Sequence, residues 1–170
     1  MIHLRLELPD DADAITDLTR IVLGARSTHS PAARMRAGSR SIADLCLVAL
    51  DQGSNLVGTL RFWPVAVGTH PAIQLGPLAV RPERRGEGFG RALVREGLER
   101  ARRAGHRVVV LIGDPGYYRT FGFLPATALG LHLPTPEDEA RFQVLALEAD
   151  ALAGVSGIAG PRHDAIAVRA

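Results

Sequence analysis

The segment that most constrains the fold lies between residues 73 and 112, where a strand, a glycine-rich loop, a helix and a second strand follow one another. Residues 73–80 are apolar, although Gly76-Pro77 interrupts them, and a proline inside an apolar strand is typical of a bulge or of broken pairing. Apolar residues repeat on one face of residues 88–104, and Gly105 suits a helix C-cap. Residues 107–112 are continuously aliphatic, as in a strand buried on both faces. This order predicts a βαβ crossover and an α/β fold.

Hydrophobic periodicity and turn signals place the other elements. We expect helices over residues 10–24, 30–40 and, for one short turn, 115–121. We expect strands over residues 2–8, 45–50, 56–67, 128–133 and 142–148, with a hairpin turn at 51–55 and an acidic loop at 134–139. No element is predicted after residue 149. A chain of 170 residues suits one buried core, so we expect a single domain over residues 1–170.

The composition and the N-terminus indicate a globular cytoplasmic protein. The chain is 46% hydrophobic and 22% charged, far from the balance of disordered sequences. Acidic residues stand where a secretory signal would need an apolar stretch, and no apolar run approaches the roughly 20 residues that span a bilayer. We therefore expect no membrane association. The single cysteine, Cys46, lies in an apolar run, which favours a buried thiol over a nucleophile.

The basic residues are all arginine, 20 in number, and the formal net charge is +2. That charge is too small to predict nucleic-acid binding, which needs basic residues gathered on one face. The arginines do gather in residues 81–107, around the glycine loop. We therefore expect no nucleic-acid partner and assign these arginines to a small anionic ligand.

The glycine loop has the composition of an anion site. Gly86, Gly88 and Gly90 stand between a strand and a helix N-terminus, where free backbone N–H groups and the helix dipole attract negative charge. Arg84, Arg85 and Arg91 surround the loop with positive charge. The spacing matches neither G-x-x-x-x-G-K-[ST] nor a G-x-G-x-x-G that opens a first βαβ unit, which argues against an ATP or nicotinamide site. Considered alone, the glycines also fit a tight turn with solvated arginines.

Two motifs together resemble those of the GNAT superfamily of acetyltransferases. Arg85-x-x-Gly88-x-Gly90 resembles its acyl-CoA-binding motif, and Gly113-Asp-Pro-Gly-Tyr-Tyr-Arg-Thr-Phe-Gly-Phe resembles its second motif. The form G-D-P-x-Y-Y-x-x-F-G-F and the strand L-G-P-L-A-V look like the YhbS-like branch of predicted acetyltransferases. The weaker resemblance extends over most of the chain.

The resemblance implies a mixed, splayed sheet of six to seven strands flanked by helices, with acetyl-CoA (coenzyme A) as cofactor. It implies that pantetheine lies between residues 73–80 and residues 107–112. The cofactor-binding residues that it implies are Leu78, Ala79, Val80, Arg84, Arg85, Gly86, Gly88, Phe89, Gly90 and Arg91. It also implies that Tyr118 is the general acid that protonates the departing thiolate. A packed aromatic is the alternative role for Tyr118, and Tyr117 is interpreted as packed or substrate-facing.

The sequence does not identify the general base or the acceptor. Some members of the superfamily carry a glutamate on the fourth strand, but the matching position here is Gln74, which cannot take a proton. His70, Glu83, Asp114 or a water chain are the alternatives. The acceptor is expected to be an amine, as a small molecule or a peptide, and a monomer and a homodimer both remain open. An inert acyl-CoA-binding sensor of the same fold is the competing hypothesis.

Overall fold

A computed structural model describes residues 1–162 and divides the chain into two compact units. The first unit comprises residues 1–30, 41–62 and 75–105, and the second comprises residues 31–40, 63–74 and the chain from residue 106. Two long strands, β3 (Leu56–Val67) and β4 (His70–Val80), contribute residues to both units. A two-residue turn joins them into a hairpin. The expected single domain over residues 1–170 stays a prediction, and its last eight residues lie outside the described part.

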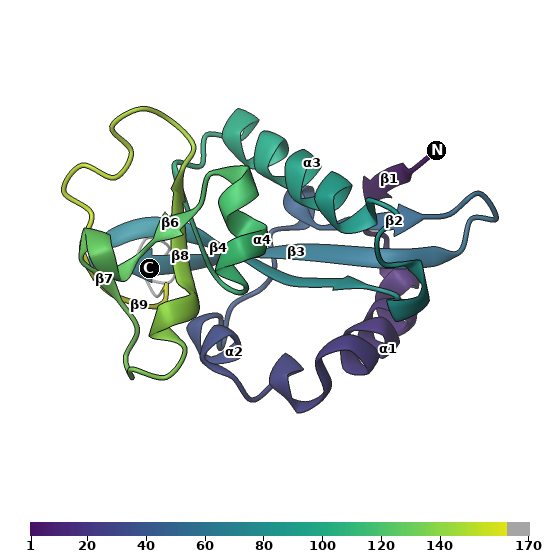
Figure 1. Cartoon of the computed structure of the whole chain (residues 1–170), viewed down its shortest axis with the longest axis horizontal. Coiled ribbons are helices and arrows are strands. Elements are labelled where there is room, and N and C mark those ends of the chain that lie inside the picture. The colour runs from purple at the N-terminus through teal and green to yellow at the C-terminus, as the bar shows by residue number, and fades with distance from the viewer. Residues whose placement is uncertain (163–170) are drawn as a thin grey trace, which may run out of the picture. The chain divides into compact units, whose positions relative to one another are not determined.

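The first unit has the strand order β1-β2-β3-β4, with β1 (His3–Leu6) and β2 (Leu47–Leu50) antiparallel to their neighbours. Side chains alternate along β2, so Val48 and Leu50 pack with Ile15 of α1 (Ala12–Leu23) on one face. On the other face lies α3 (Phe89–Arg103), whose Leu93 approaches Gly58 of β3. Figure 1 shows α1 and α3 on opposite sides of these strands.

The second unit places β5 (Val108–Ile112) beside β4, which is the parallel pair that the βαβ prediction requires. In register, Ile73 pairs with Val109 and Gln74 with Val110. The antiparallel strand β8 (Phe142–Ala146) follows β5, and β6 (Leu124–Pro125) pairs with β8. Strand β9 (Gly157–Pro161) pairs with the end of β3 and with β7 (Leu131–His132). Parallel and antiparallel pairs coexist, so the predicted mixed α/β architecture is confirmed.

The core of the second unit packs against α2 (Pro31–Met35). Met35 joins a buried cluster that includes Val110, Val144 and Leu131. A further short helix, α4 (Pro115–Tyr118), continues into a 3-10 turn, as the sequence predicted for residues 115–121. Cys46 is the buried free thiol that was expected, and its Sγ donates to the Ile42 carbonyl at 3.2 Å.

Several predicted boundaries were wrong. The helix expected over residues 30–40 ends at Met35, because turn hydrogen bonds follow it and Gly38 has a φ of 76°. The strand expected over residues 128–133 is reduced to Leu131–His132, since a 3-10 turn occupies Thr127–Leu129. Strands β6 and β9 were not predicted, and nine strands lie within residues 1–162 instead of six to seven. Both missed strands contain proline, which propensity assigns to loops.

The predicted irregularity at Gly76-Pro77 is present, although β4 continues through it. Gly76 has a φ of 132°, a conformation that residues with a Cβ rarely adopt, and the Gly76–Pro77 peptide bond is cis. Among residues 1–162, no helix combines the length and apolarity that a membrane span needs.

Candidate active site

The glycine loop connects β4 to α3 within the first unit. Arg81 anchors its start to β3, because its backbone N–H donates to the Val57 carbonyl at 2.9 Å and its Nε donates to the Leu56 carbonyl at 3.0 Å. Gly86 and Gly88 then have φ values of 83° and 92°, and Gly88 is the N-cap of α3. Such angles are strained for any residue except glycine, so the sequence of the loop determines its path.

The turn leaves a run of backbone donors unused. Within residues 1–162, the N–H groups of residues 86–90 donate to no protein acceptor. Two of these groups belong to the first turn of α3, a helix of 15 residues whose dipole adds positive potential at this end. Unsatisfied N–H groups of this kind bind phosphates readily. The loop therefore has the chemistry of the predicted anion site.

The predicted cofactor residues differ in what their side chains can do. Phe89 and Ala79 are buried, so they can offer a ligand only backbone groups. Leu78 and Val80 are half-buried on β4. Arg85 is exposed, and its side chain makes no hydrogen bond or ion pair within the described residues, which leaves its charge available to an anion.

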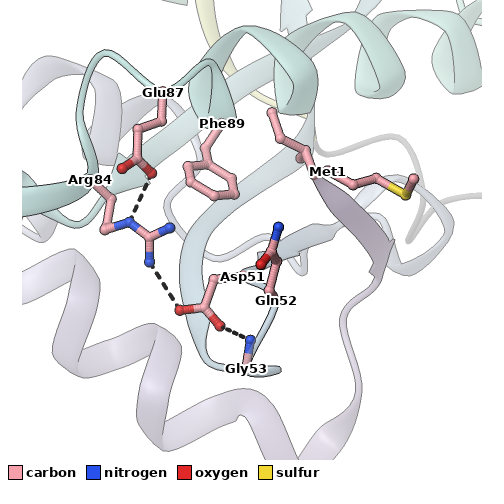
Figure 2. A pocket seen from close by; sticks show the side chains of 8 residues that line it. Met1, Asp51, Gln52, Gly53, Arg84, Glu87 and Phe89 are labelled. Carbon is pink, nitrogen blue, oxygen red and sulfur yellow. Dashed lines mark hydrogen bonds and ion pairs between the residues drawn. The ribbon is translucent and has the colours of Figure 1, made fainter.

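Arg84 was expected to bind the cofactor, but its guanidinium is already engaged by two carboxylates. Its Nη1 lies 2.9 Å from Asp51 Oδ2 and its Nε lies 2.8 Å from Glu87 Oε2, as Figure 2 shows. The guanidinium carbon lies 5.2 Å from the centre of the Phe89 ring. The hydrogen bonds to Glu87 and Asp51 raise the pKa of Arg84 above its usual value. These residues line a polar pocket of about 300 Å³ that Met1, Ile2, Gln52 and Gly53 complete.

The second motif forms a compact turn in the second unit. Asp114 caps α4 by accepting from the Gly116 N–H at 3.0 Å, and Gly122 ends the turn with a φ of 98°. The Tyr118 ring packs edge-on against Tyr117 at 4.9 Å and against Phe123 at 5.9 Å between centroids. The predicted Tyr118 is thus held firmly by its neighbours.

Burial determines the protonation of Tyr118. Desolvation raises its pKa well above the ordinary value of 10.0, the neighbouring Tyr117 and Asp114 raise it further, and Arg141 opposes them. The phenol therefore keeps its proton throughout the physiological range. A group in this state can donate a proton and cannot serve as a base.

Gln74, at the position expected for the base, and the three candidate bases occupy distinct settings. Gln74 is buried, and its Nε2 donates to the Ala32 carbonyl at 2.9 Å, while its Oε1 has no hydrogen-bond partner within residues 1–162. His70 begins β4, and its buried Nδ1 also lacks a partner in the described chain. Glu83 is exposed, and Asp114 is engaged as the cap of α4.

The expected site residues fall into two groups. Those between Leu78 and Arg91, with the candidate base Glu83 among them, belong to the first unit, whereas Tyr118 and the candidate bases His70 and Asp114 belong to the second. Reasoning from the sequence missed Asp51 and Glu87 as partners of Arg84. Glu87 lies inside the loop and could have been found from its three-residue spacing to Arg84. Asp51 had no such signal, because it lies 33 residues away in a turn.

A strand, a loop of free N–H groups, a helix and a parallel strand define an α/β protein whose loop has the chemistry of an anion site. The family model described as an acetyltransferase (GNAT) domain matches residues 4–126. The uncharacterized N-acetyltransferase YhbS of Escherichia coli K12 is 38% identical over 160 residues, which cover 91% of this chain and 93% of YhbS. The chain belongs to the GNAT family of N-acetyltransferases.

Solved structures agree with this assignment. The crystal structure of Escherichia coli YhbS in complex with CoA matches with a TM-score of 0.80 and 33% identity, covering 95% of this chain and 89% of that one. A GNAT family acetyltransferase from Brucella melitensis, in complex with acetyl-CoA, matches with a TM-score of 0.68 and 33% identity over 98% of both chains. The resemblance inferred from the two motifs is confirmed.

Proposed function

We propose that this chain transfers the acetyl group of acetyl-CoA to a primary amine of a small molecule or a peptide, by direct attack within a ternary complex. The observation that carries the proposal is the unused N–H groups of residues 86–90 at the N-terminus of α3. They fit the pyrophosphate of the cofactor, and the two glycines with positive φ leave no side chain in its way. The complexes of the two relatives with CoA and acetyl-CoA support the same choice.

The cofactor, when bound, supplies the activated acetyl thioester and a thiolate leaving group. In the proposed roles, the loop binds the phosphates through its N–H groups, and Arg85 adds a charge that no residue of the described chain neutralises. Backbone groups of Leu78, Ala79 and Val80 bind pantetheine. Tyr118 donates its phenolic proton to the departing sulfur, and burial keeps that proton on the phenol until the thiolate forms.

The amine must lose a proton before it attacks, and Gln74 cannot take it. Asp114 is the cap of α4, and Glu83 lies in solvent. His70 combines a titratable ring with a buried nitrogen that lacks a partner within residues 1–162, so we assign it as the first base to test. We further propose a cytoplasmic location, with no nucleic-acid partner.

The deciding experiment measures thiol release from acetyl-CoA with a panel of polyamines, aminoglycosides, amino acids and peptides. The wild type should release thiol with at least one amine. Tyr118→Phe keeps the packed ring, so acetyl-CoA affinity should stay within about threefold, while turnover should fall by about 10² to 10⁴. Tyr117→Phe is the matched control, because it removes the same atom from the adjacent ring, and it should turn over normally.

Two outcomes would overturn parts of the proposal. Normal turnover by Tyr118→Phe would make Tyr118 a packing residue. Tight acetyl-CoA binding without thiol release on any amine would favour an inert sensor of the same fold, a reading that Gln74 at the expected position of the base supports. Absence of acetyl-CoA binding to the folded wild type would reject the cofactor assignment itself.

A further inference from the structure

An anion site needs an available positive charge, but the guanidinium of Arg84 already contacts two carboxylates. Its guanidinium bridges a carboxylate of the loop, Glu87, and a carboxylate of the β2–β3 turn, Asp51 (Figure 2). The Arg84 side chain is 29% exposed and that of Asp51 is 15% exposed. Nε and Nη1 are engaged by these partners, so a phosphate could reach only Nη2 without displacing a carboxylate.

Hydrogen bonds within its own turn hold Asp51 in place, independently of Arg84. Its Oδ1 accepts from the N–H groups of Gly53 at 2.8 Å and Asn55 at 2.9 Å, and Asn55 Nδ2 lies 3.2 Å from its Oδ2. These bonds, with the contribution of Arg84, lower the pKa of Asp51 below its usual range. The carboxylate is therefore a rigid, ionised anchor on the hairpin.

The charges around the loop give the same answer. Arg84, Asp51 and Glu87 together carry a charge of −1, so the positive potential that favours a pyrophosphate comes from Arg85 and the N-terminus of α3 and not from this cluster. With Arg84 in place, both carboxylates are engaged, and the guanidinium also stacks against Phe89, the first residue of α3. The contacts of Arg84 thus link the loop to the β2–β3 turn and to the start of α3, and they engage the carboxylates of Asp51 and Glu87.

We propose that Arg84 is a positioning residue and not a phosphate ligand: with Asp51 and Glu87 it ties the glycine loop to the β2–β3 turn, and so keeps the N–H groups of residues 86–90 aligned for a pyrophosphate. This inference rests on the proposed function, because it assumes that coenzyme A is the ligand. It assigns to Asp51, far from the motif in sequence, a role in cofactor affinity.

The direction in which one substitution changes coenzyme A affinity distinguishes a positioning role of Arg84 from a direct contact with phosphate. Asp51→Asn keeps an amide oxygen for Gly53 and Asn55 but removes the charge that binds Arg84. If Arg84 contacted phosphate, releasing it and removing a negative charge would leave coenzyme A affinity equal or higher. If Arg84 instead holds the glycine loop to the β2–β3 turn, coenzyme A affinity should fall about tenfold although a negative charge has been removed. Calorimetric titration with coenzyme A measures the change, and unaltered or tighter binding would overturn the proposal.

Glu99→Gln is the matched control. It also removes a carboxylate that pairs with arginines, Arg102 and Arg103, but at the far end of α3. Its coenzyme A affinity should stay within about twofold of the wild type, because a solvent-exposed ion pair at that distance is screened. A loss equal to that of Asp51→Asn would mean that any weakened ion pair lowers affinity, and would also overturn the assignment.

A second variant keeps the question decidable if Asp51→Asn fails to fold. Arg84→Lys retains the charge, but one ammonium cannot span both carboxylates as the guanidinium does. If Arg84 positions the loop, this variant should lose coenzyme A affinity several-fold. If Arg84 contacts phosphate, affinity should be retained, since lysine binds phosphate as a point charge. In the Arg84→Ala background, Asp51→Asn should cause no further loss, because both cut the same link. A wild type that does not bind coenzyme A at all would reject the proposed function and leave this link without a role.

Discussion

At the scale of single residues, one glycine of the second motif shows how closely Tyr118 is packed. A Cβ placed on Gly113 would lie 2.5 Å from Tyr118 Cε2, closer than nonbonded atoms approach. The Tyr118 ring also contacts Phe121 and Phe123, so it has little room to retreat. Gly113 is therefore the residue that allows Tyr118 to occupy its position.

Gly113→Ala should move the Tyr118 ring and destabilise the second motif. Overpacking of this kind costs about 1–3 kcal/mol, and loss of the position of the proton donor should lower turnover by more than the stability change alone explains. Gly116→Ala is the control, because its Cβ would meet only the Asp114 carboxylate, at 3.4 Å from Oδ1 and 3.9 Å from Oδ2. Thermal unfolding and thiol release measure the two effects. Equal behaviour of the two variants would show that the ring can shift without consequence.

At the scale of elements, α3 packs on β3 through a glycine. A Cβ on Gly97 would lie 2.7 Å from Phe62 Cε2 and 3.0 Å from Leu60 Cδ2, and both of these side chains are fully buried. The helix thus approaches the strand more closely than any side chain would permit. This contact sets the position of the helix whose first turn belongs to the proposed anion site.

Gly97→Ala tests whether this approach is required. Alanine improves helix propensity by about 1 kcal/mol, whereas a clash with an immobile ring costs about 1–3 kcal/mol. We expect the clash to dominate and the melting temperature to fall by about 2–8 °C. Arg95→Ala, on the exposed face of the same helix, should melt close to the wild type. A Gly97→Ala protein that melts above the wild type would show that Phe62 yields.

At the scale of the whole molecule, ion pairs reduce what the cluster of arginines can do. Arg100 pairs with Glu96, and both Arg102 and Arg103 pair with Glu99 along α3. With a net charge of only +2, these pairs leave little positive surface for a polyanion. The acidic loop is likewise engaged, because Glu137 pairs with Arg34 and Glu139 with His132.

Duplex DNA should therefore bind weakly. At about 0.15 M salt, we expect a dissociation constant weaker than about 100 μM, at the weak limit of nonspecific DNA binding. Fluorescence anisotropy with a labelled duplex measures it, and the same titration at about 0.02 M salt controls for general electrostatics. Nanomolar binding at the higher salt would contradict the assignment of the arginines to a small anion.

The sequence predicted the elements whose signals are local. The glycine loop, α3 and the aliphatic strand β5 were found because periodicity, capping glycines and a buried run act within a few residues of one another. The family assignment came from the resemblance of two motifs, Arg85–Gly90 and Gly113–Phe123, and the comparisons confirm it. The short strands β6 and β9 could not be found, since residues such as Pro125 and Gly160 become strand only when a neighbouring strand pairs with them.

By itself, the sequence determined the α/β order, the loop with its free N–H groups and the position of Tyr118 in its motif. Only the tertiary structure decided which arginine is already engaged and how closely the Tyr118 ring is packed. Arg84 and Arg85 are adjacent and chemically identical, yet one bridges Asp51 and Glu87 and the other is exposed. The physical reason is that an ion pair across 33 residues depends on where two turns meet in space, which no local pattern of residues records.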